Sequence, residues 1–234
     1  MRIKAGSISR LNVYEACPFR AKLAYVDRIE QPKRLISEAL NRGNRVHSAA
    51  EDFATGARSD LVAELRNFNS EFKELRHLFQ QKQVVIEKMW CFDEGWSSID
   101  ESLRDKTWLR VKLDAAVFLD RETVVAIDYK TGKRYRNELK HANQCQLYQL
   151  AVFLRYPQIQ NLITELWYTD LNELVQMKFT RSQGLRFLQG FNDRLLMMMT
   201  DEVFEAKPNP WNCKWCPYRR EPEGTGDCGR DPSE

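Results

Sequence analysis

Two runs of β-branched and aromatic residues lie close together in the middle of the chain. The first is TWLRVKLDAAVFL over residues 107–119, and the second is TVVAIDYK over residues 123–130. Such runs are typical of β-strands, and the three residues that separate them are the length of a hairpin loop. The sequence therefore predicts an antiparallel hairpin around which the rest of the fold must be built.

The length of the loop decides which residues of the hairpin face each other. With residues 120–122 in the loop, Asp114 lies opposite Asp128, and Lys112 lies opposite Lys130. Opposite residues in antiparallel strands point to the same face, with their Cβ atoms about 4.5–5.5 Å apart. A two-residue loop would shift the register by one residue and send the two aspartates to opposite faces.

Helical and strand patterns alternate on both sides of this hairpin. Apolar spacing predicts helices over residues 8–25 with a break at Pro18, 34–53, 61–80, 138–155 and 180–204, and further strands over 83–90 and 162–168. Helices before and after a group of strands favour an α/β sandwich with a mixed sheet.

Composition and charge exclude several classes of protein. With 43% hydrophobic and 29% charged residues, the chain is neither collagen-like nor disordered. The net charge of +3 does not by itself indicate a nucleic-acid-binding protein. No run approaches the roughly 18 apolar residues that span a bilayer, so we expect a cytoplasmic protein without membrane contact. In that reducing compartment, the six cysteines are expected to be thiols or metal ligands rather than disulfides.

Asp114 and Asp128 are the first candidate functional residues. Two facing carboxylates repel each other unless a cation lies between them, and oxygen ligands of this kind suit Mg²⁺ or Mn²⁺. Lys130 lies two residues after Asp128 on the same face, where its charge can stabilise a transition state or orient a metal-bound water. The structural alternative is a buried ion pair between Asp128 and Lys130.

Three further polar residues lie on predicted helices. His47 lies four residues after Gly43 on one helical face, and Gln144 and Tyr148 share a face of the helix after the hairpin. A histidine in a helix is more often an ordinary core or surface residue than a ligand. The Gln144 and Tyr148 pair could contact a phosphate backbone or could be amphipathic patterning alone.

Positive charge gathers directly after the second strand of the hairpin. Lys133, Arg134 and Arg136 surround Tyr135 in this segment. Such cations are suited to DNA phosphates, and an aromatic ring among them can stack on an unpaired base. The alternative is a solvated basic loop.

The candidate residues form a set of motifs in a fixed order. The order is Gly43-x-x-x-His47, Asp114, Asp128-Tyr129-Lys130 and Gln144-x-x-x-Tyr148. This order resembles the PD-(D/E)xK nucleases and, more narrowly, their RecB-like branch, which includes the AddB nuclease domain and the CRISPR-associated RecB-like exonucleases. The resemblance implies a restriction-endonuclease-like fold, with a mixed central sheet flanked by helices, in a single nuclease domain over residues 1–234.

The same resemblance implies the roles of individual residues. It implies a divalent metal ion held by His47, Asp114, Asp128 and the main-chain carbonyl of Tyr129, with Lys130 in the active site. The reaction it implies is the hydrolysis of DNA phosphodiester bonds.

The cysteines near the C-terminus form a second candidate centre. Cys213 and Cys216 have the spacing typical of one metal centre, and Cys228 follows them. Cys17 is the best candidate for a fourth ligand, because the other two cysteines lie at a strand end and inside a helix. Four cysteines alone do not separate Zn²⁺ from an iron-sulfur cluster, and ordinary reduced thiols remain the simplest alternative.

RecB-like families place one cysteine near the N-terminus and three near the C-terminus around a [4Fe-4S] cluster. The resemblance therefore implies such a cluster on Cys17, Cys213, Cys216 and Cys228. It also implies that residues 1–30 and 205–234 together form a cluster-binding part, with residues 31–204 as the catalytic core. A tie between these ends would stabilise the fold by at most about 5 kcal/mol.

Together these expectations describe a metal-dependent deoxyribonuclease, an exonuclease acting on single-stranded or end-bearing DNA. Recombination, replication, repair and CRISPR adaptation are the processes implied, with protein partners in a complex of that kind. One alternative is an inactive DNA-binding or partner-binding module of the same fold, although the intact Asp114, Asp128 and Lys130 argue against it. The other alternative, a zinc-stabilised regulatory protein, leaves the facing acids unexplained.

Overall fold

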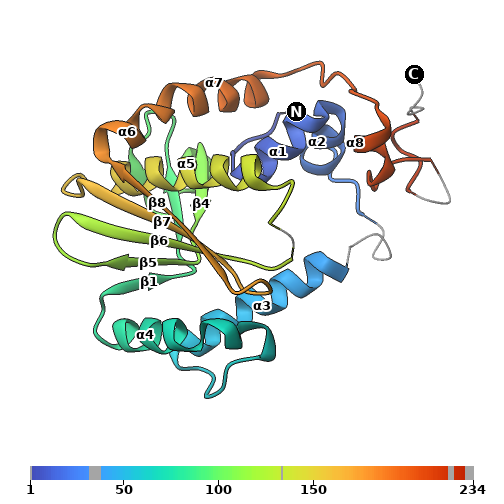
Figure 1. Ribbon diagram of the computed structural model, residues 1–234. Coiled ribbons are helices and arrows are strands. Elements are labelled where there is room, and N and C mark those ends of the chain that lie inside the picture. Colours follow the sequence, from blue (N-terminus) through green and yellow to red (C-terminus); the bar gives the residue numbers. More distant parts are fainter. Residues whose placement is uncertain (1, 32–37, 133, 221–223, 230–234) are drawn as a thin grey trace.

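A five-stranded mixed sheet forms the centre of the molecule, and a three-stranded antiparallel sheet lies beside it (Figure 1). The computed structural model describes residues 2–31, 38–132, 134–220 and 224–229. The central sheet has the order β1 (Val84–Ile86), β5 (Ala115–Phe118), β6 (Thr123–Lys130), β7 (Asn161–Tyr168) and β8 (Glu173–Thr180). The second sheet has the order β3 (Ser98–Ile99), β2 (Met89–Phe92) and β4 (Leu109–Lys112). Among the strands of the central sheet that the structure describes, only β6 and β7 pair in parallel.

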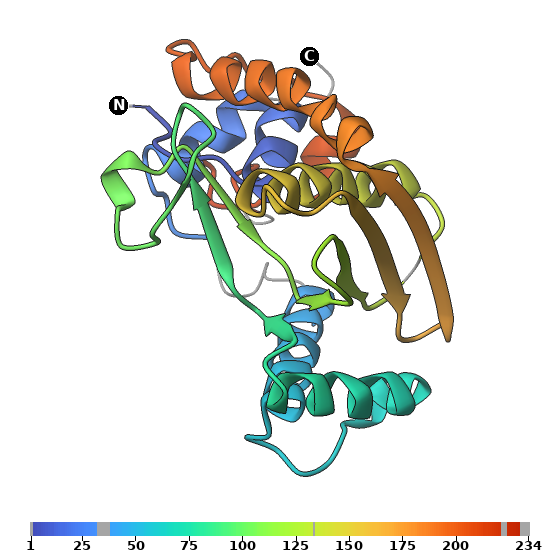
Figure 2. The ribbon, with the colours of Figure 1, turned by 90° about the vertical axis from the view of Figure 1, so that its left-hand side faces the viewer.

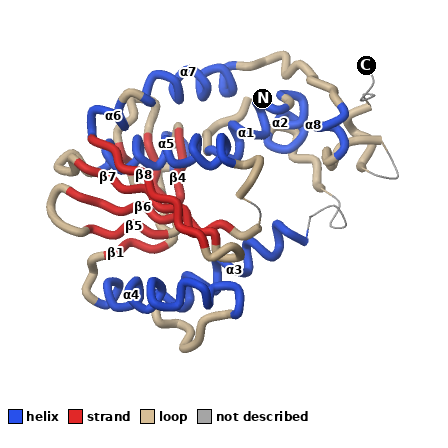
Figure 3. The backbone as a smooth tube through the Cα atoms, viewed as in Figure 1, coloured by secondary structure: helices blue, strands red, loops and turns tan. Residues whose placement is uncertain are grey.

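Helices cover both faces of the central sheet, which confirms the predicted α/β fold with a mixed sheet (Figure 3). One face packs against α3 (Glu38–Thr55) and α4 (Asn69–Gln80), and the other against α5 (Glu138–Arg155). The remaining helices are α1 (Ile8–Ala16), α2 (Pro18–Tyr25), α6 (Arg181–Leu185), α7 (Phe187–Thr200) and α8 (Pro210–Lys214), with 3-10 helices at Ala63–Phe68 and Arg104–Lys106.

Strand β6 shows why the sheet must be covered on both sides. Val125 and Ile127 face the core formed with α3 and α4, whereas Val124 and Ala126 face the core formed with α5. Side chains alternate between the two faces of a strand, so a run of apolar residues is expected only where both faces are buried. By the same alternation, Asp128 falls on the α5 side of the sheet.

The predicted hairpin register is confirmed. Ala115 pairs with Ile127 and Phe118 with Val124, as a three-residue loop requires. The next pair in that register is Asp114 and Asp128. The two residues of a pair point to the same face of the sheet.

Residues 107–119, however, do not form one strand. The chain leaves the second sheet after Lys112 and enters the central sheet at Ala115. Lys112 therefore pairs with Met89, and the predicted pairing of Lys112 with Lys130 is wrong. Residues 83–90 divide in the same way between β1 and β2. The Glu87 amide donates to the carbonyl of Asp114 (2.9 Å), so the bend between β1 and β2 lies beside the bend between β4 and β5. Figure 2 shows these strands passing from one sheet to the other.

Several predicted helices differ from the observed ones at their ends. The break at Pro18 is confirmed, with Cys17 between α1 and α2. The first residues of the predicted helix 34–53 lie outside the described part of the chain. Helix α3 begins at Glu38. Strand β8 was not predicted, because its residues alternate between exposed and half-buried and form no apolar run.

No helix of the described part is long and apolar enough to cross a membrane.

The N-terminal segment adds to the edge of the second sheet. The Gly6 amide donates to the carbonyl of Trp108 (2.7 Å), and the Arg110 amide donates to the carbonyl of Gly6 (2.9 Å). Gly6 has no room for a Cβ atom, because the side chain of Leu195 from α7 occupies that space. This close packing holds the N-terminal segment between β4 and α7.

Candidate active site

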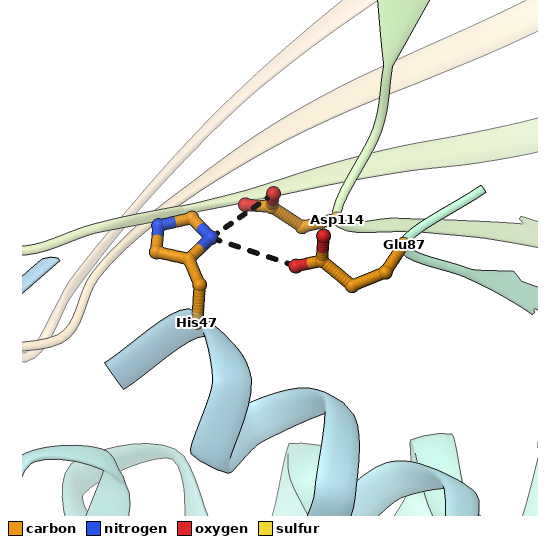
Figure 4. Close-up of side chains that lie close together, drawn as sticks. All are labelled: His47, Glu87 and Asp114. Carbon is orange, nitrogen blue, oxygen red and sulfur yellow. Dashed lines mark ion pairs between the residues drawn. The ribbon is translucent and has the colours of Figure 1, made fainter. Parts of the chain in front are cut away.

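Three side chains from three elements meet where the strands bend (Figure 4). His47 lies on α3, Glu87 between β1 and β2, and Asp114 between β4 and β5. His47 Nδ1 is 3.1 Å from Asp114 Oδ1 and 3.7 Å from Glu87 Oε1, and one ligand atom of each residue lies within 4.8 Å of the others. One imidazole nitrogen and two carboxylates are suitable ligands for a divalent cation.

The local backbone explains how these residues come together. Val46, directly before His47, is buried against the sheet and fixes that turn of α3. Glu87 has a φ of 50°, a left-handed conformation that costs a non-glycine residue on the order of 1–2 kcal/mol. The bend between β1 and β2 turns the Glu87 carboxylate toward His47. The strained residue is therefore itself one of the candidate ligands.

Asp128 lies at the centre of a second network, on the α5 side. Its Oδ1 accepts hydrogen bonds from the Tyr148 hydroxyl (2.7 Å) and from Gln144 Nε2 (3.0 Å). Its Oδ2 pairs with Lys130 Nζ (2.6 Å), which also donates to Gln144 Oε1 (2.7 Å). The predicted alternative of an Asp128–Lys130 ion pair is thus present, and Gln144 and Tyr148 hold its two members in place.

A hydrogen bond within the hairpin joins the two groups of residues. The Tyr129 amide donates to Asp114 Oδ2 (2.6 Å), while the Tyr129 side chain is buried on the α3 side. Asp114 and Asp128 are both buried, with 7% and 3% of their surface exposed. The Glu87 side chain is only 6% exposed, so the site combines three buried carboxylates.

Electrostatics in the site favour a bound cation. Burial and the nearby charge of Asp128 raise the pKa of Asp114 to about 6. Burial lowers the pKa of His47, but the neighbouring carboxylates of Asp114 and Glu87 outweigh that effect and raise it to about 10. Glu87 Oε1 is buried without a hydrogen-bond partner among the described residues. An acceptor of this kind, facing His47 and Asp114, fits the coordination of a divalent metal ion.

The raised pKa of His47 predicts how the metal-free protein responds to pH. A group whose pKa is higher in the folded than in the unfolded state stabilises the fold below the unfolded value, here 6.5, and loses that contribution as the pH rises through about 10. In EDTA, wild-type protein should melt above His47→Gln at pH 7, and the gap should close by pH 10. Thermal melts across this range measure the effect. His77→Gln, on the exposed side of α4, is the control, and a constant gap for His47→Gln would contradict the assignment.

The predicted basic segment is only partly described. Lys133 lies outside the described residues. Arg134 pairs with Glu173 at 2.7 Å, so a carboxylate balances its charge, whereas Arg136 and Tyr135 are exposed.

Four cysteines line one small cavity between the two ends of the chain. Lys207 and Pro208 line the same cavity, and the Lys207 amide donates to Cys17 Sγ (3.5 Å). The members of the set are Cys17, Cys213, Cys216 and Cys228. Cys91 and Cys145 are buried elsewhere, in β2 and α5.

Sequence reasoning missed Glu87 as a candidate ligand. The signal was present, because Glu87 is an acid within the apolar run QVVIEKMW. A single acid in such a run does not show which residue it meets, since its partners His47 and Asp114 come from distant segments.

Comparisons with known proteins identify the family of the chain and solved structures with a similar fold. A family model described as the PD-(D/E)XK nuclease superfamily matches residues 5–220. Among solved structures, the chain is similar to a candidate exonuclease from Eubacterium rectale, with 13% identity, 93% of this chain and 88% of that chain covered, and a TM-score of 0.56. It is also similar to SSO0001, with 15% identity, 93% and 85% covered, and a TM-score of 0.46.

An alkaline exonuclease from Laribacter hongkongensis is a more distant structural match, with 10% identity, 83% of this chain and 91% of that chain covered, and a TM-score of 0.29. No curated protein matches the chain. At these identities the structural likeness concerns the fold alone, whereas the family model spans most of the sequence. The chain therefore belongs to the PD-(D/E)XK nuclease superfamily.

Proposed function

We propose that this protein is a divalent-metal-dependent DNA exonuclease. The observation that carries the proposal is the arrangement of the two hairpin acids. Asp114 is held by His47 and the Tyr129 amide, and Asp128 is held by Lys130, in a chain that belongs to a nuclease superfamily. Buried acids that face a lysine at the end of a sheet are otherwise costly, and a metal ion accounts for them.

The residues of the site fit the binding of Mg²⁺ or Mn²⁺. Asp114, Asp128, His47 and Glu87, with the main-chain carbonyl of Tyr129, are the proposed ligands. A bound ion supplies Lewis acidity and a nucleophilic water for phosphodiester hydrolysis. Displacing the proton from His47 frees its Nδ1 for coordination, so metal affinity should rise with pH.

Lys130 and the α5 residues have separate proposed roles. Gln144 and Tyr148 donate to Asp128 Oδ1, and Gln144 also accepts from Lys130. These bonds orient the carboxylate and hold the ammonium group beside it. A positive charge fixed in a partly buried site can stabilise the negative charge that develops on the phosphate.

An exonuclease, rather than an endonuclease, is favoured by the likeness to the Eubacterium rectale candidate exonuclease. In the presence of Mg²⁺, the protein should release short products from linear single-stranded DNA and should leave a closed circle of the same sequence intact. Gel analysis of the two substrates, each with an EDTA control, measures this difference. Cleavage of the circle at a rate comparable to the linear strand would overturn the exonuclease proposal.

We also infer that the four-cysteine cavity holds a [4Fe-4S] cluster, with Zn²⁺ as the alternative occupant. The support is that the four cysteines which the resemblance implies as ligands, Cys17 with the three C-terminal cysteines, line one cavity. Thiolates bind either group, so metal analysis and visible absorption decide between them.

A further inference from the structure

A large cavity on the N-terminal side of the second sheet is rich in cations. It measures about 1210 Å³, and segments before α1, after α2 and around β4 line it. We call this cavity the basic groove. Its cationic side chains are Arg2, Lys4, Arg10, Arg28, Arg104 and Arg110. Asp27 and Asp105 also line the cavity, so cations outnumber carboxylates three to one.

Among the residues that the structure describes, most of this positive charge has no acidic partner. Within the described part of the chain, no carboxylate forms an ion pair with Arg28, Arg104 or Arg110, although Arg2 pairs with Glu202. Asp27, one of the two acids of the cavity, is already paired with Lys22 (2.5 Å).

Arg10 illustrates the surplus of charge in detail. Its Nη1 donates to the carbonyl of Ala5 (2.6 Å), and its guanidinium lies 5.0 Å from the centre of the Tyr25 ring. Both partners are neutral. Burial and the nearby charges of Arg110 and Arg28 lower the pKa of Arg10, so both of these guanidinium groups lie close enough to repel the charge of Arg10. A bound anion would relieve that repulsion.

A second cavity adjoins the basic groove. It measures about 310 Å³ and shares Arg10 and Arg110 with the first cavity. Its lining also includes Lys112, Gln144 and Tyr148, the side chains that contact Glu87 and Asp128. The cations that line the two cavities therefore extend from the N-terminal segment to side chains beside the proposed catalytic carboxylates.

We propose that the basic groove binds the phosphate backbone of a single DNA strand whose scissile bond lies in the active site. This assignment rests on the proposed nuclease function and adds the route by which the substrate reaches the site. A chain of phosphates matches separated cations along a path better than one small anion does. The small volume of the second cavity, about 310 Å³, favours a single strand over a duplex, because both strands of a duplex would have to fit beside Gln144 and Tyr148.

The test measures binding without cleavage. Fluorescence anisotropy in EDTA gives the affinity for a labelled single-stranded oligonucleotide at several salt concentrations. In the variant Arg28→Gln/Arg110→Gln, the slope of log affinity against log salt should become shallower by about 1.4, since each phosphate contact to a single strand contributes about 0.7. The matched control Arg121→Gln/Arg186→Gln changes two exposed arginines elsewhere and should keep the wild-type slope.

A charge-conserving variant guards against loss of folding. Arg28→Lys/Arg110→Lys should keep a slope close to that of the wild type, because lysine also neutralises a phosphate. An equal slope in the glutamine variant and the control would overturn the groove assignment. A second result would also overturn it: binding of poly-glutamate that depends on Arg28 and Arg110, together with DNA binding that does not depend on them. The groove would then fit an acidic protein.

The outcomes separate this inference from the proposed function. A wild-type protein that binds the strand with the expected slope but cleaves no DNA with Mg²⁺ or Mn²⁺ would overturn the nuclease proposal and support the groove. Cleavage by a protein whose DNA binding does not depend on Arg28 and Arg110 would overturn the groove alone.

Discussion

Asp128→Asn is expected to lower the rate of DNA cleavage by at least about 10²–10³-fold, the loss typical of removing one charged group that acts on the transition state. Asparagine keeps the shape of the side chain and can still accept from Tyr148, but it removes the charge proposed to hold the metal ion and to pair with Lys130. Initial rates on an end-labelled single strand with saturating Mg²⁺ measure the loss. Asp120→Asn, in the loop at the other end of the same hairpin, should cleave at the wild-type rate.

The stability of the same variant in the absence of metal separates loss of charge from loss of folding. Burial and the charge of Asp128 raise the pKa of Asp114, because the two carboxylates repel each other. Removing the charge of Asp128 relieves that repulsion but also breaks the ion pair with Lys130, so the two effects oppose each other and the melting temperature of Asp128→Asn in EDTA should stay close to that of the wild type. A variant that melts much earlier would have lost activity through unfolding, and one that keeps a tenth of the wild-type rate would contradict the catalytic role.

Cys17→Ser is expected to lower thermal stability and cluster content together. Cys17 lies between α1 and α2 and shares its cavity with cysteines near the other end of the chain. Through a bound cluster, it would close a loop of nearly the whole chain, a constraint of at most about 5 kcal/mol in the free energy of unfolding. For a chain of this size the loss corresponds to a fall of roughly 10–20 °C in melting temperature.

Iron analysis, visible absorption and calorimetry of anaerobically purified protein measure both effects. A [4Fe-4S] cluster makes the wild-type protein brown, whereas Zn²⁺ leaves it colourless. Cys91→Ser and Cys145→Ser are the controls, and each should keep the cluster and show only a small packing defect. Full iron content and stability in Cys17→Ser would show that the four-cysteine site is wrong.

The hairpin shows how far sequence reasoning reaches. Loop length and strand alternation together predicted the register of β5 and β6, because both depend on residues close in sequence. The same reasoning failed for Lys112, since nothing local shows that the chain changes sheets between β4 and β5. The bend is stabilised by a hydrogen bond from the amide of Glu87, which lies between β1 and β2, far from Asp114 in the sequence.

The candidate site was also predicted only in part from the sequence. His47, Asp114, Asp128 and Lys130 were predicted in a motif order, and the structure places His47 beside Asp114 and Lys130 beside Asp128. Glu87 was missed, because only the fold brings it to His47. The basic groove was also out of reach, since its arginines come from separate segments and the net charge of the chain is only +3.

Mn²⁺ binding, measured beside Mn²⁺-activated cleavage, tests most directly whether the two hairpin acids form a metal-dependent catalytic site. In wild-type protein, the Mn²⁺ concentration that half-saturates binding in a calorimetric titration should match the one that half-activates cleavage of a single strand. Asp114→Asn should weaken the binding and abolish the cleavage, whereas Asp120→Asn should change neither. Cleavage at the wild-type rate in EDTA, or by an Asp114→Asn variant that binds no Mn²⁺, would contradict the account.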